Sequence, residues 1–255
     1  PPPPPPPPPL FFFNPQDAIR DPLWSRGLGD VYKRQELSHK YSTADEDLLV
    51  LSDLSFSVGK EQFVSIVGPS GCGKSTLTKL IAGLSVPLKG KILISGSPVD
   101  SPRESIGMAF QNPVLLEWRT ALDNICLPLE IVSPQMTRIQ KIARATELLE
   151  MVGLKDFSQS RPSQLSGGMK QRVSLCRSLV HRPEILILDE PFGALDAFTR
   201  EGLWKTLKDL KTSENFTCIL ITHDLREAIY LSDEIVILTD RPGKVKKSVK
   251  INFKR

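Results

Sequence analysis

The chain has 255 residues, of which 40% are hydrophobic and 24% are charged, and its formal net charge is +4 at pH 7. This composition is typical of a soluble globular protein, and the length allows one large α/β domain or two small ones. No run of about 18 apolar residues occurs, so the sequence predicts no membrane-spanning helix. The mild positive charge does not require a nucleic-acid partner, although it suits a protein that lies near anionic lipid.

Cysteine usage indicates a reducing compartment. The four cysteines are scattered along the chain without the spacing of a metal site, and one lies inside a glycine-rich loop: Cys72, Cys126, Cys176 and Cys218. We therefore expect reduced thiols and a cytoplasmic setting.

The N-terminal tract is not explained by any folded core. Residues 1–9 are all proline and residues 11–13 are all phenylalanine, while residues 21–35 lack helical or strand periodicity. A polyproline II arm that binds an SH3-type domain is one interpretation. The other is a translated adapter tail, because runs of C encode proline and runs of U encode phenylalanine. We adopt the second and expect residues 1–35 to be a disordered, non-native tail outside the fold, with one domain over residues 36–255.

Short apolar segments follow at residues 37–41, 48–51 and 91–94, and they predict short antiparallel strands, with a turn at residues 95–98. Longer apolar runs then alternate with helical patterns. The runs predict buried strands at residues 63–67, 106–110, 185–188, 217–221 and 234–238.

Helical periodicity appears between these strands. The apolar faces that predict helices are Leu77, Leu80, Ile81 and Leu84; residues 137–152, capped by Gly153; Met169, Val173, Cys176 and Val180, closed by Pro183; and Leu203, Leu207 and Leu210. Residues 112–129 show a mixed pattern. Strands that alternate with helices predict an α/β fold, with a parallel sheet covered by helices on both sides.

A glycine-rich segment between the strand at residues 63–67 and the next helix matches the pattern G-x-x-x-x-G-K-[ST]. It consists of Gly68, Pro69, Ser70, Gly71, Cys72, Gly73, Lys74, Ser75 and Thr76. Glycines allow backbone N–H groups to surround phosphate oxygens, and the helix start adds its positive dipole end. Lys74 can then reach the β- and γ-phosphates, and Ser75 can ligate Mg²⁺. The alternative is a glycine-rich turn before a core helix.

Six segments together resemble one family, the ATP-binding cassette (ABC) ATPases. They are residues 68–76, Gln111, residues 165–169, residues 185–190, residues 193–196 and His223, and the resemblance extends from about residue 37 to the end. It implies a P-loop NTPase fold of the RecA-like type, with a mostly parallel sheet flanked by helices. It also implies an N-terminal antiparallel β subdomain and an inserted α-helical subdomain at about residues 112–170.

The resemblance assigns catalytic roles to four residues. Asp189 ends a buried strand, where it can hold Mg²⁺ through its water shell, and Glu190 can orient or deprotonate the attacking water. His223 can reach the γ-phosphate of ATP. Gln111 can touch both the Mg²⁺ shell and the segment that follows, so it is expected to be a ligand and a sensor. The alternative for Asp189 and Glu190 is an ordinary acidic strand end, and a lone histidine is usually structural.

A second group of residues points to a dimer. Ser166, Gly167 and Gly168 lie at a helix N-terminus, which favours anions, and in the family this site completes the ATP site of a second subunit. Two ATP molecules are then held head to tail, so a monomer should bind ATP yet scarcely hydrolyse it. Asp196 is expected to link the two sites. Tyr41 takes the place of the aromatic residue that stacks on adenine; the alternative is a surface tyrosine at a strand end.

The resemblance also implies membrane partners. Residues 113–118 place apolar and aromatic side chains where the family receives a helix from a separate membrane permease, although they could also fill a local core. Residues 119–124 and 241–243 are similar to the nitrate, sulfonate and taurine importer branch, which uses a solute-binding protein. The chain is thus expected to lie at the cytoplasmic face of the cell membrane, as a peripheral subunit without a nucleic-acid partner.

Two departures from that branch are visible. Glu117 stands where the branch often has proline, and the chain stops at Arg255, where relatives usually continue, so a C-terminal piece is expected to be missing. The last residues are basic: Lys244, Lys246, Lys247, Lys250, Lys254 and Arg255. They could face lipid headgroups or form a solvated face.

Three other classes of function remain as alternatives. A soluble ABC ATPase that acts on DNA or the ribosome would carry a long coiled coil or two cassettes in tandem, and this sequence has neither. A P-loop small-molecule kinase would not need residues 165–169. A regulator that only binds ATP would not need both Glu190 and His223.

Overall fold

The computed structural model describes residues 30–42, 47–193 and 195–252, with only the backbone described for residues 30–36 and 42. The expectation for residues 1–29 therefore lies outside the described residues. The boundary at residue 35 is wrong, however, because β1 (Asp30–Ser42) already begins at Asp30. Its first residues pair with β3 (Ser57–Gly59) and β5 (Lys89–Ile94) through the backbone, which requires no side-chain periodicity.

The central sheet has six strands in the order β11-β10-β4-β9-β8-β7. All neighbours are parallel except β10 and β11, which are antiparallel. The strands are β4 (Phe63–Val67), β7 (Ile106–Phe110), β8 (Ile185–Asp189), β9 (Thr217–Thr222), β10 (Glu234–Leu238) and β11 (Val245–Lys250). Every residue of β4 and β9 is buried, as expected for strands covered on both faces. The prediction of a mostly parallel sheet is confirmed.

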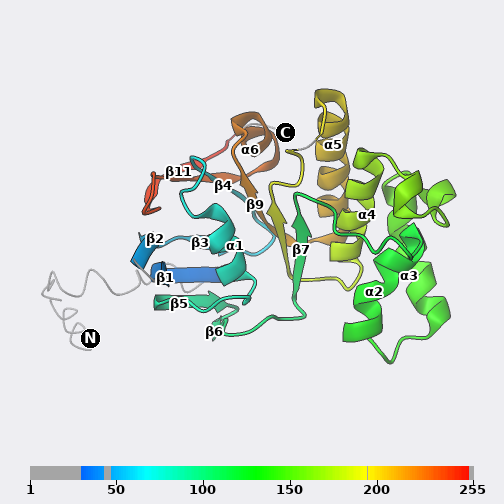
Figure 1. Ribbon diagram of the computed structural model, residues 1–255, viewed down its shortest axis with the longest axis horizontal. Coiled ribbons are helices and arrows are strands. Elements are labelled where there is room, and N and C mark those ends of the chain that lie inside the picture. Colours follow the sequence, from blue (N-terminus) through cyan, green and yellow to red (C-terminus); the bar gives the residue numbers. More distant parts are fainter. Residues whose placement is uncertain (1–29, 43–46, 194, 253–255) are drawn as a thin grey trace, which may run out of the picture.

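A second, antiparallel sheet covers one end of the molecule (Figure 1). It has the order β2-β1-β5-β6, with β3 also paired to β1. The additional strands are β2 (Asp47–Leu54) and β6 (Ser97–Pro98), and β6 occupies the last two residues of the segment predicted as a turn. This sheet is the predicted N-terminal antiparallel β subdomain.

The helices occupy distinct places around the central sheet. They are α1 (Lys74–Ile81), α2 (Ala121–Val132), α3 (Arg138–Met151), α4 (Gly167–Leu179), α5 (Ala197–Glu214) and α6 (Leu225–Leu231), with 3₁₀ turns at Lys155–Phe157 and Pro162–Gln164. Figure 1 shows α2, α3 and α4 together at the end opposite the antiparallel sheet, with α1 beside that sheet. Among the described residues, no helix combines the length and hydrophobicity that a membrane span requires.

Three elements differ from the sequence prediction. Helix α2 begins in the segment with the mixed pattern because the Thr120 hydroxyl caps it by accepting from the Asp123 amide, and Pro128 inside it obscures the periodicity. Leu84 does not lie on a helix face: α1 ends at Ile81, and Leu84 is 55% exposed. Lys246, Lys247 and Lys250 of the basic C-terminal segment lie on β11, which pairs with β10 through the backbone, whereas Lys254 and Arg255 lie outside the described residues.

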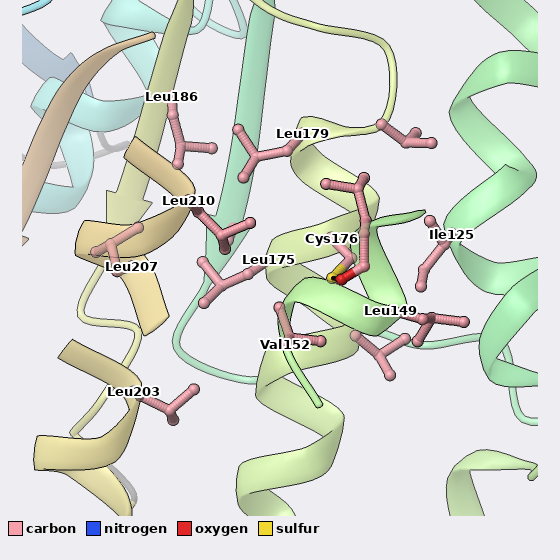
Figure 2. Close-up of a cluster of buried hydrophobic side chains, with 14 of the residues drawn as sticks. Ile125, Leu149, Val152, Leu175, Cys176, Leu179, Leu186, Leu203, Leu207 and Leu210 are labelled. Carbon is pink, nitrogen blue, oxygen red and sulfur yellow. Dashed lines mark hydrogen bonds between the residues drawn. The ribbon is translucent and has the colours of Figure 1, made fainter. Parts of the chain in front are cut away.

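The larger hydrophobic core is built around α4. Figure 2 shows α4 with Leu175 and Leu179 directed toward Leu207 and Leu210 of α5, while side chains of α2 and α3 pack on its other side. The second core cluster lies between the two sheets and includes Leu77, Leu80 and Ile81 of α1. The two clusters thus cover opposite faces of the central sheet.

One buried arginine joins three helices at the edge of the larger core. Arg144 of α3 is 7% exposed, and its Nε donates to the carbonyl of Val180 just after α4 at 3.3 Å. Its Nη1 donates to Glu214 Oε1, at the end of α5, at 2.9 Å. Because the Glu214 side chain is only 10% exposed, its carboxylate depends on Arg144 for charge compensation.

We predict that Arg144→Met lowers the free energy of unfolding by about 3–5 kcal/mol, because it leaves the Glu214 carboxylate buried without its partner. The control is Arg138→Met on the exposed surface of the same helix, which should change stability by less than about 0.5 kcal/mol. Chemical denaturation of both variants measures the difference. Equal stability of the two variants would contradict the role given to Arg144.

Candidate functional site

The glycine-rich loop has a backbone shape that other residues could not easily adopt. Gly71 and Gly73 have φ angles of 77° and 105°, in the left-handed region. A Cβ on Gly73 would also lie 2.8 Å from Val50 Cγ1. A side chain at this position would therefore clash with β2 and also strain the backbone. The loop leads directly into α1, whose N-terminus adds its dipole to the free N–H groups. This arrangement is suited to binding phosphate.

Lys74 lies across the loop. The side chain is buried, and its Nζ donates to the carbonyl oxygens of Gly68 and Pro69, both at 2.8 Å. These bonds hold the ammonium group at the centre of the loop, where phosphate oxygens would meet it. Ser75, the next residue, is exposed at the start of α1.

A pocket of about 350 Å³ opens above the loop, which is the size of a small-molecule site. It is lined by Tyr41, Leu48, Val50, Ser70, Gly71, Gly73, Lys74, Ser75, Thr76, Glu190 and Arg241. The Tyr41 hydroxyl lies 3.3 Å from Thr76 Oγ1, and the ring packs edge-on against His39 at 5.1 Å. Tyr41 is 39% exposed, so its ring offers a face to the pocket rim. Tyr41 and the phosphate loop thus share one pocket.

Two carboxylates end β8 beside the loop. Burial, and then the neighbouring charge of Glu190, raises the pKa of Asp189, while Lys74 and Lys79 oppose the shift. Glu190 has a φ of 48°, a strained value for a residue other than glycine, and its amide donates to the Ile221 carbonyl at 2.8 Å. This backbone turn directs the Glu190 side chain differently from that of Asp189.

Glu190 points toward the histidine that follows β9. Its Oε2 lies 3.2 Å from His223 Nδ1, and the His223 side chain is 60% exposed. His223 also lines a groove with Gly68, Pro69 and Ser70 of the phosphate loop. The structure therefore brings together the loop, the carboxylate and the histidine that the sequence singled out.

Gln111 follows β7 at the same edge of the sheet. A Cβ on Gly193 would lie 3.3 Å from Gln111 Nε2, so the glutamine packs against the segment that follows Glu190. Gln111 is exposed and does not line the pocket above the phosphate loop.

Four other predicted residues lie away from that pocket. Ser166, Gly167 and Gly168 begin α4, where the Ser166 hydroxyl accepts from the Met169 amide at 3.3 Å. Asp196 caps α5, and hydrogen bonds from the Thr199 hydroxyl and amide lower its pKa. Ser166, Gly167 and Asp196 are exposed. Within one copy, these residues are not brought to the phosphate loop.

Three residues in or beside the site were missed by the sequence analysis. Gln171 is 2% exposed, and its Nε2 donates to the Phe110 carbonyl at 3.1 Å, which ties α4 to the residue before Gln111. The sequence signal that could have identified Gln171 is its position just after residues 165–169. Arg241 lines the pocket because the following Gly243 packs on the loop, where a Cβ would lie 2.3 Å from the Cys72 carbonyl. Nothing in the sequence connects residues so far apart.

A third missed residue, Glu227, lies behind His223. It is 3% exposed, and the Thr222 hydroxyl donates to it. Burial is the largest cause that raises the pKa of Glu227 to about 7; Asp224 and Glu190 add to the shift, while Thr222 and Arg200 oppose it.

The fold and the pocket define an ATPase of the P-loop class, and comparisons with known proteins identify the family. A family model described as "ABC transporter" matches residues 51–193. The chain belongs to the ABC transporter family, in which it is an ATP-binding cassette that binds and hydrolyses ATP. The resemblance inferred from the sequence is confirmed.

Individual relatives are similar over most of the chain. A nitrate import ATP-binding protein of Synechococcus elongatus is 43% identical, over 76% of this chain and 71% of the relative. An aliphatic sulfonates import ATP-binding protein of Bacillus cereus is 41% identical, over 85% of this chain and 84% of the relative. Among solved structures, a dimeric ATP-binding cassette in a post-hydrolysis state with ADP and Pi has a TM-score of 0.77 and 32% identity, and the match covers 87% and 99% of the two chains.

We predict that Glu190→Gln retains ATP binding but slows hydrolysis by about 10²–10⁴-fold, because it removes the carboxylate that orients the attacking water. Nucleotide binding is measured by fluorescence titration and hydrolysis by phosphate release. Lys74→Ala is the contrasting variant, which should weaken binding itself. Hydrolysis by Glu190→Gln at close to the parental rate would defeat the assignment.

We also predict that Glu227→Gln becomes more stable relative to the parent as the pH rises from 5 to 7.5. The folded parent holds the Glu227 proton up to about pH 7, whereas the unfolded chain releases it near 4.5, so the free energy of unfolding falls as pH rises through that window. Because glutamine does not titrate, the free energy of unfolding of the variant lacks this decrease. Thermal unfolding at several pH values checks the trend, with Glu201→Gln, on the exposed surface of α5, as the control. A pH-independent difference would contradict the prediction.

Proposed function

We propose that this chain is the ATP-hydrolysing subunit of an importer for nitrate, a sulfonate, taurine or a similar small solute. Two copies bind head to tail around two ATP molecules and drive a separate membrane permease from the cytoplasmic face of the cell membrane. A solute-binding protein delivers the cargo on the other side. The similarity to nitrate and sulfonate import subunits supports this choice of solute class.

ATP is held by the pocket above the phosphate loop. The adenine stacks on Tyr41, and the triphosphate lies on the backbone of residues 68–76 with Lys74 between its β- and γ-phosphates. Ser75 and Asp189 fit a Mg²⁺ ion, since they supply a hydroxyl and a carboxylate oxygen and leave other positions to water and phosphate. Gln111, which follows β7, would offer its side-chain amide oxygen to the same ion. The bound ion supplies charge neutralisation for the phosphates.

Hydrolysis depends on the placement of Glu190 and His223. Glu190 accepts a hydrogen bond from the attacking water and aligns it with the γ-phosphate, while His223 donates to a γ-phosphate oxygen. The 3.2 Å contact between Glu190 Oε2 and His223 Nδ1 keeps both side chains on one side of the phosphate. The chemistry is therefore mainly positioning and electrostatic stabilisation.

The second copy completes the site. The first residues of α4 are exposed and carry free backbone N–H groups, although no phosphate loop of the same copy lies against them. Ser166, Gly167 and Gly168 of one copy thus bind the γ-phosphate held by the other. Asp196, exposed at the start of α5, lies between the two sites.

Exposed apolar residues that follow Gln111 in the chain support the proposal that a membrane permease docks here. Trp118 is 72% exposed and Val114 is 62% exposed, whereas Leu115 between them is buried. Leu115 thus fills a local core, whereas the exposed Val114 and Trp118 support the proposed docking surface. A large exposed tryptophan is typical of the residues that dominate protein interfaces.

We predict that Trp118→Ala weakens binding to the permease by about tenfold or more, because interface tryptophans commonly contribute that much. Labelled chain is titrated onto inside-out membrane vesicles stripped of peripheral proteins, and the cross-linked partner is identified by mass spectrometry. Ile139→Ala, which removes an 80% exposed isoleucine from α3, is the matched control. Unchanged binding by Trp118→Ala, or a ribosomal or DNA-bound partner, would refute the proposal.

A further inference from the structure

The first turn of α5 touches two separate parts of the site. Asp196 caps this turn by accepting from the Thr199 amide at 3.0 Å. Thr199 lies so close to α4 that a Cβ on Gly168 would be 2.5 Å from its Cγ2. The next residue, Arg200, reaches the loop that carries His223. The turn therefore lies between the exposed start of α4 and the His223 loop.

Arg200 makes hydrogen bonds to the His223 loop and to Leu195, in the segment that precedes α5. Its Nη1 donates to Asp224 Oδ2 at 3.0 Å, and its Nη2 donates to the Leu195 carbonyl at 3.0 Å. The Arg200 and Asp224 side chains are 27% and 24% exposed, so solvent screens their attraction less than that of a surface ion pair. Asp224 directly follows His223 and also caps α6 by accepting from the Arg226 amide at 2.8 Å. One guanidinium group thus links the Leu195 backbone to the His223 loop.

Glu227 approaches the same loop from α6. Within the part of the chain that the structure describes, neither Glu227 Oε1 nor Arg200 Nε has a hydrogen-bond partner, although both atoms are buried. Both residues line a cavity that also touches Glu190 and His223 and leaves about 20 Å³ for the centre of a water molecule. A buried water needs roughly 10–15 Å³ of such space and polar partners, and here one donor and one acceptor are available.

We infer that Arg200 is a positioning residue for ATP hydrolysis, which holds the Leu195 backbone and the His223 loop together and shares one buried water molecule with Glu227. Glu190 and His223 line the same cavity, so a shift of the loop changes the spacing between the carboxylate and the imidazole. Neither Arg200 nor Glu227 lines the nucleotide pocket, so the effect on ATP is indirect. The inference concerns the ATPase reaction and does not depend on transport.

The kinetic test uses Arg200→Lys, which keeps the charge but offers a single nitrogen. The three N–H groups of lysine share one nitrogen, whereas Arg200 uses Nη1 for Asp224, Nη2 for the Leu195 carbonyl and Nε toward the cavity, so lysine cannot reproduce this geometry. We expect kcat to fall by about tenfold, the effect of losing one charged hydrogen bond, while the KM for ATP stays within about twofold of the parent. Lys205→Gln, on the exposed surface of α5, is the control. An unchanged kcat, or a rise in KM alone, would overturn the inference.

A double-mutant cycle separates a shared bridge from independent effects. Asp224→Asn retains a residue that caps helices well, so α6 should remain intact. If Arg200 acts through Asp224, the double variant should be no slower than the slower single variant. Fully multiplicative losses, with unchanged melting temperatures, would show that the two residues act separately and would reject the bridge.

A crystal structure of the parent chain tests the water independently of activity. We expect density for one water molecule within about 3 Å of both Arg200 Nε and Glu227 Oε1. In Arg200→Lys, this density should be lost or displaced. A direct bond between Arg200 Nε and Glu227, with no room for water, would refute the shared site.

Discussion

The backbone pairing of β4, β9, β8 and β7 is the constraint on which the rest of the site depends. In this ladder Val67 pairs with Thr222, Ile221 pairs with Asp189, and Asp189 pairs with Phe110. Parallel strands in register end at one edge of the sheet, so the segments that follow them meet there. The phosphate loop, Glu190, His223 and Gln111 are therefore neighbours because their strands stop together.

The helices packed around this edge fix the orientation of the neighbouring segments. α4 lies in the larger core between α5 and the pair α2 and α3, which orients its exposed first residues (Figure 2). Arg144 of α3 ties the C-terminal ends of α4 and α5 together. Because the interior is closely packed, a shift of α4 is transmitted to α5 and not absorbed locally. The start of α4 meets the first turn of α5, where a Cβ on Gly168 would lie 2.5 Å from Thr199 Cγ2.

Acidic side chains are crowded together in this part of the molecule. Burial and then the charge of Glu190 raise the pKa of Asp189, and burial and then the charges of Asp224 and Glu190 raise the pKa of Glu227. Lys74 and Arg200 are the nearby cations that oppose these shifts. Such crowding of like charges is tolerated where function requires it, as in many sites that bind phosphate.

The sequence by itself determined the chemistry of this protein. The motif at residues 68–76, the acidic pair after a buried strand and the histidine after another are local patterns, and each is set by residues that are neighbours in the chain. Their recognition required no knowledge of the tertiary structure. The alternation of strands and helices was also sufficient to predict the mostly parallel sheet.

Only the tertiary structure decided the contacts between segments that are distant in the chain. Gln171 against Phe110, Arg241 at the pocket and Arg200 against Asp224 depend on how helices and loops pack, and no periodic pattern encodes such pairs. The strand at residues 30–35 was missed for the same reason, since backbone hydrogen bonds to β3 and β5 hold it irrespective of its side chains. Local sequence specifies which groups are present, whereas packing specifies which of them touch.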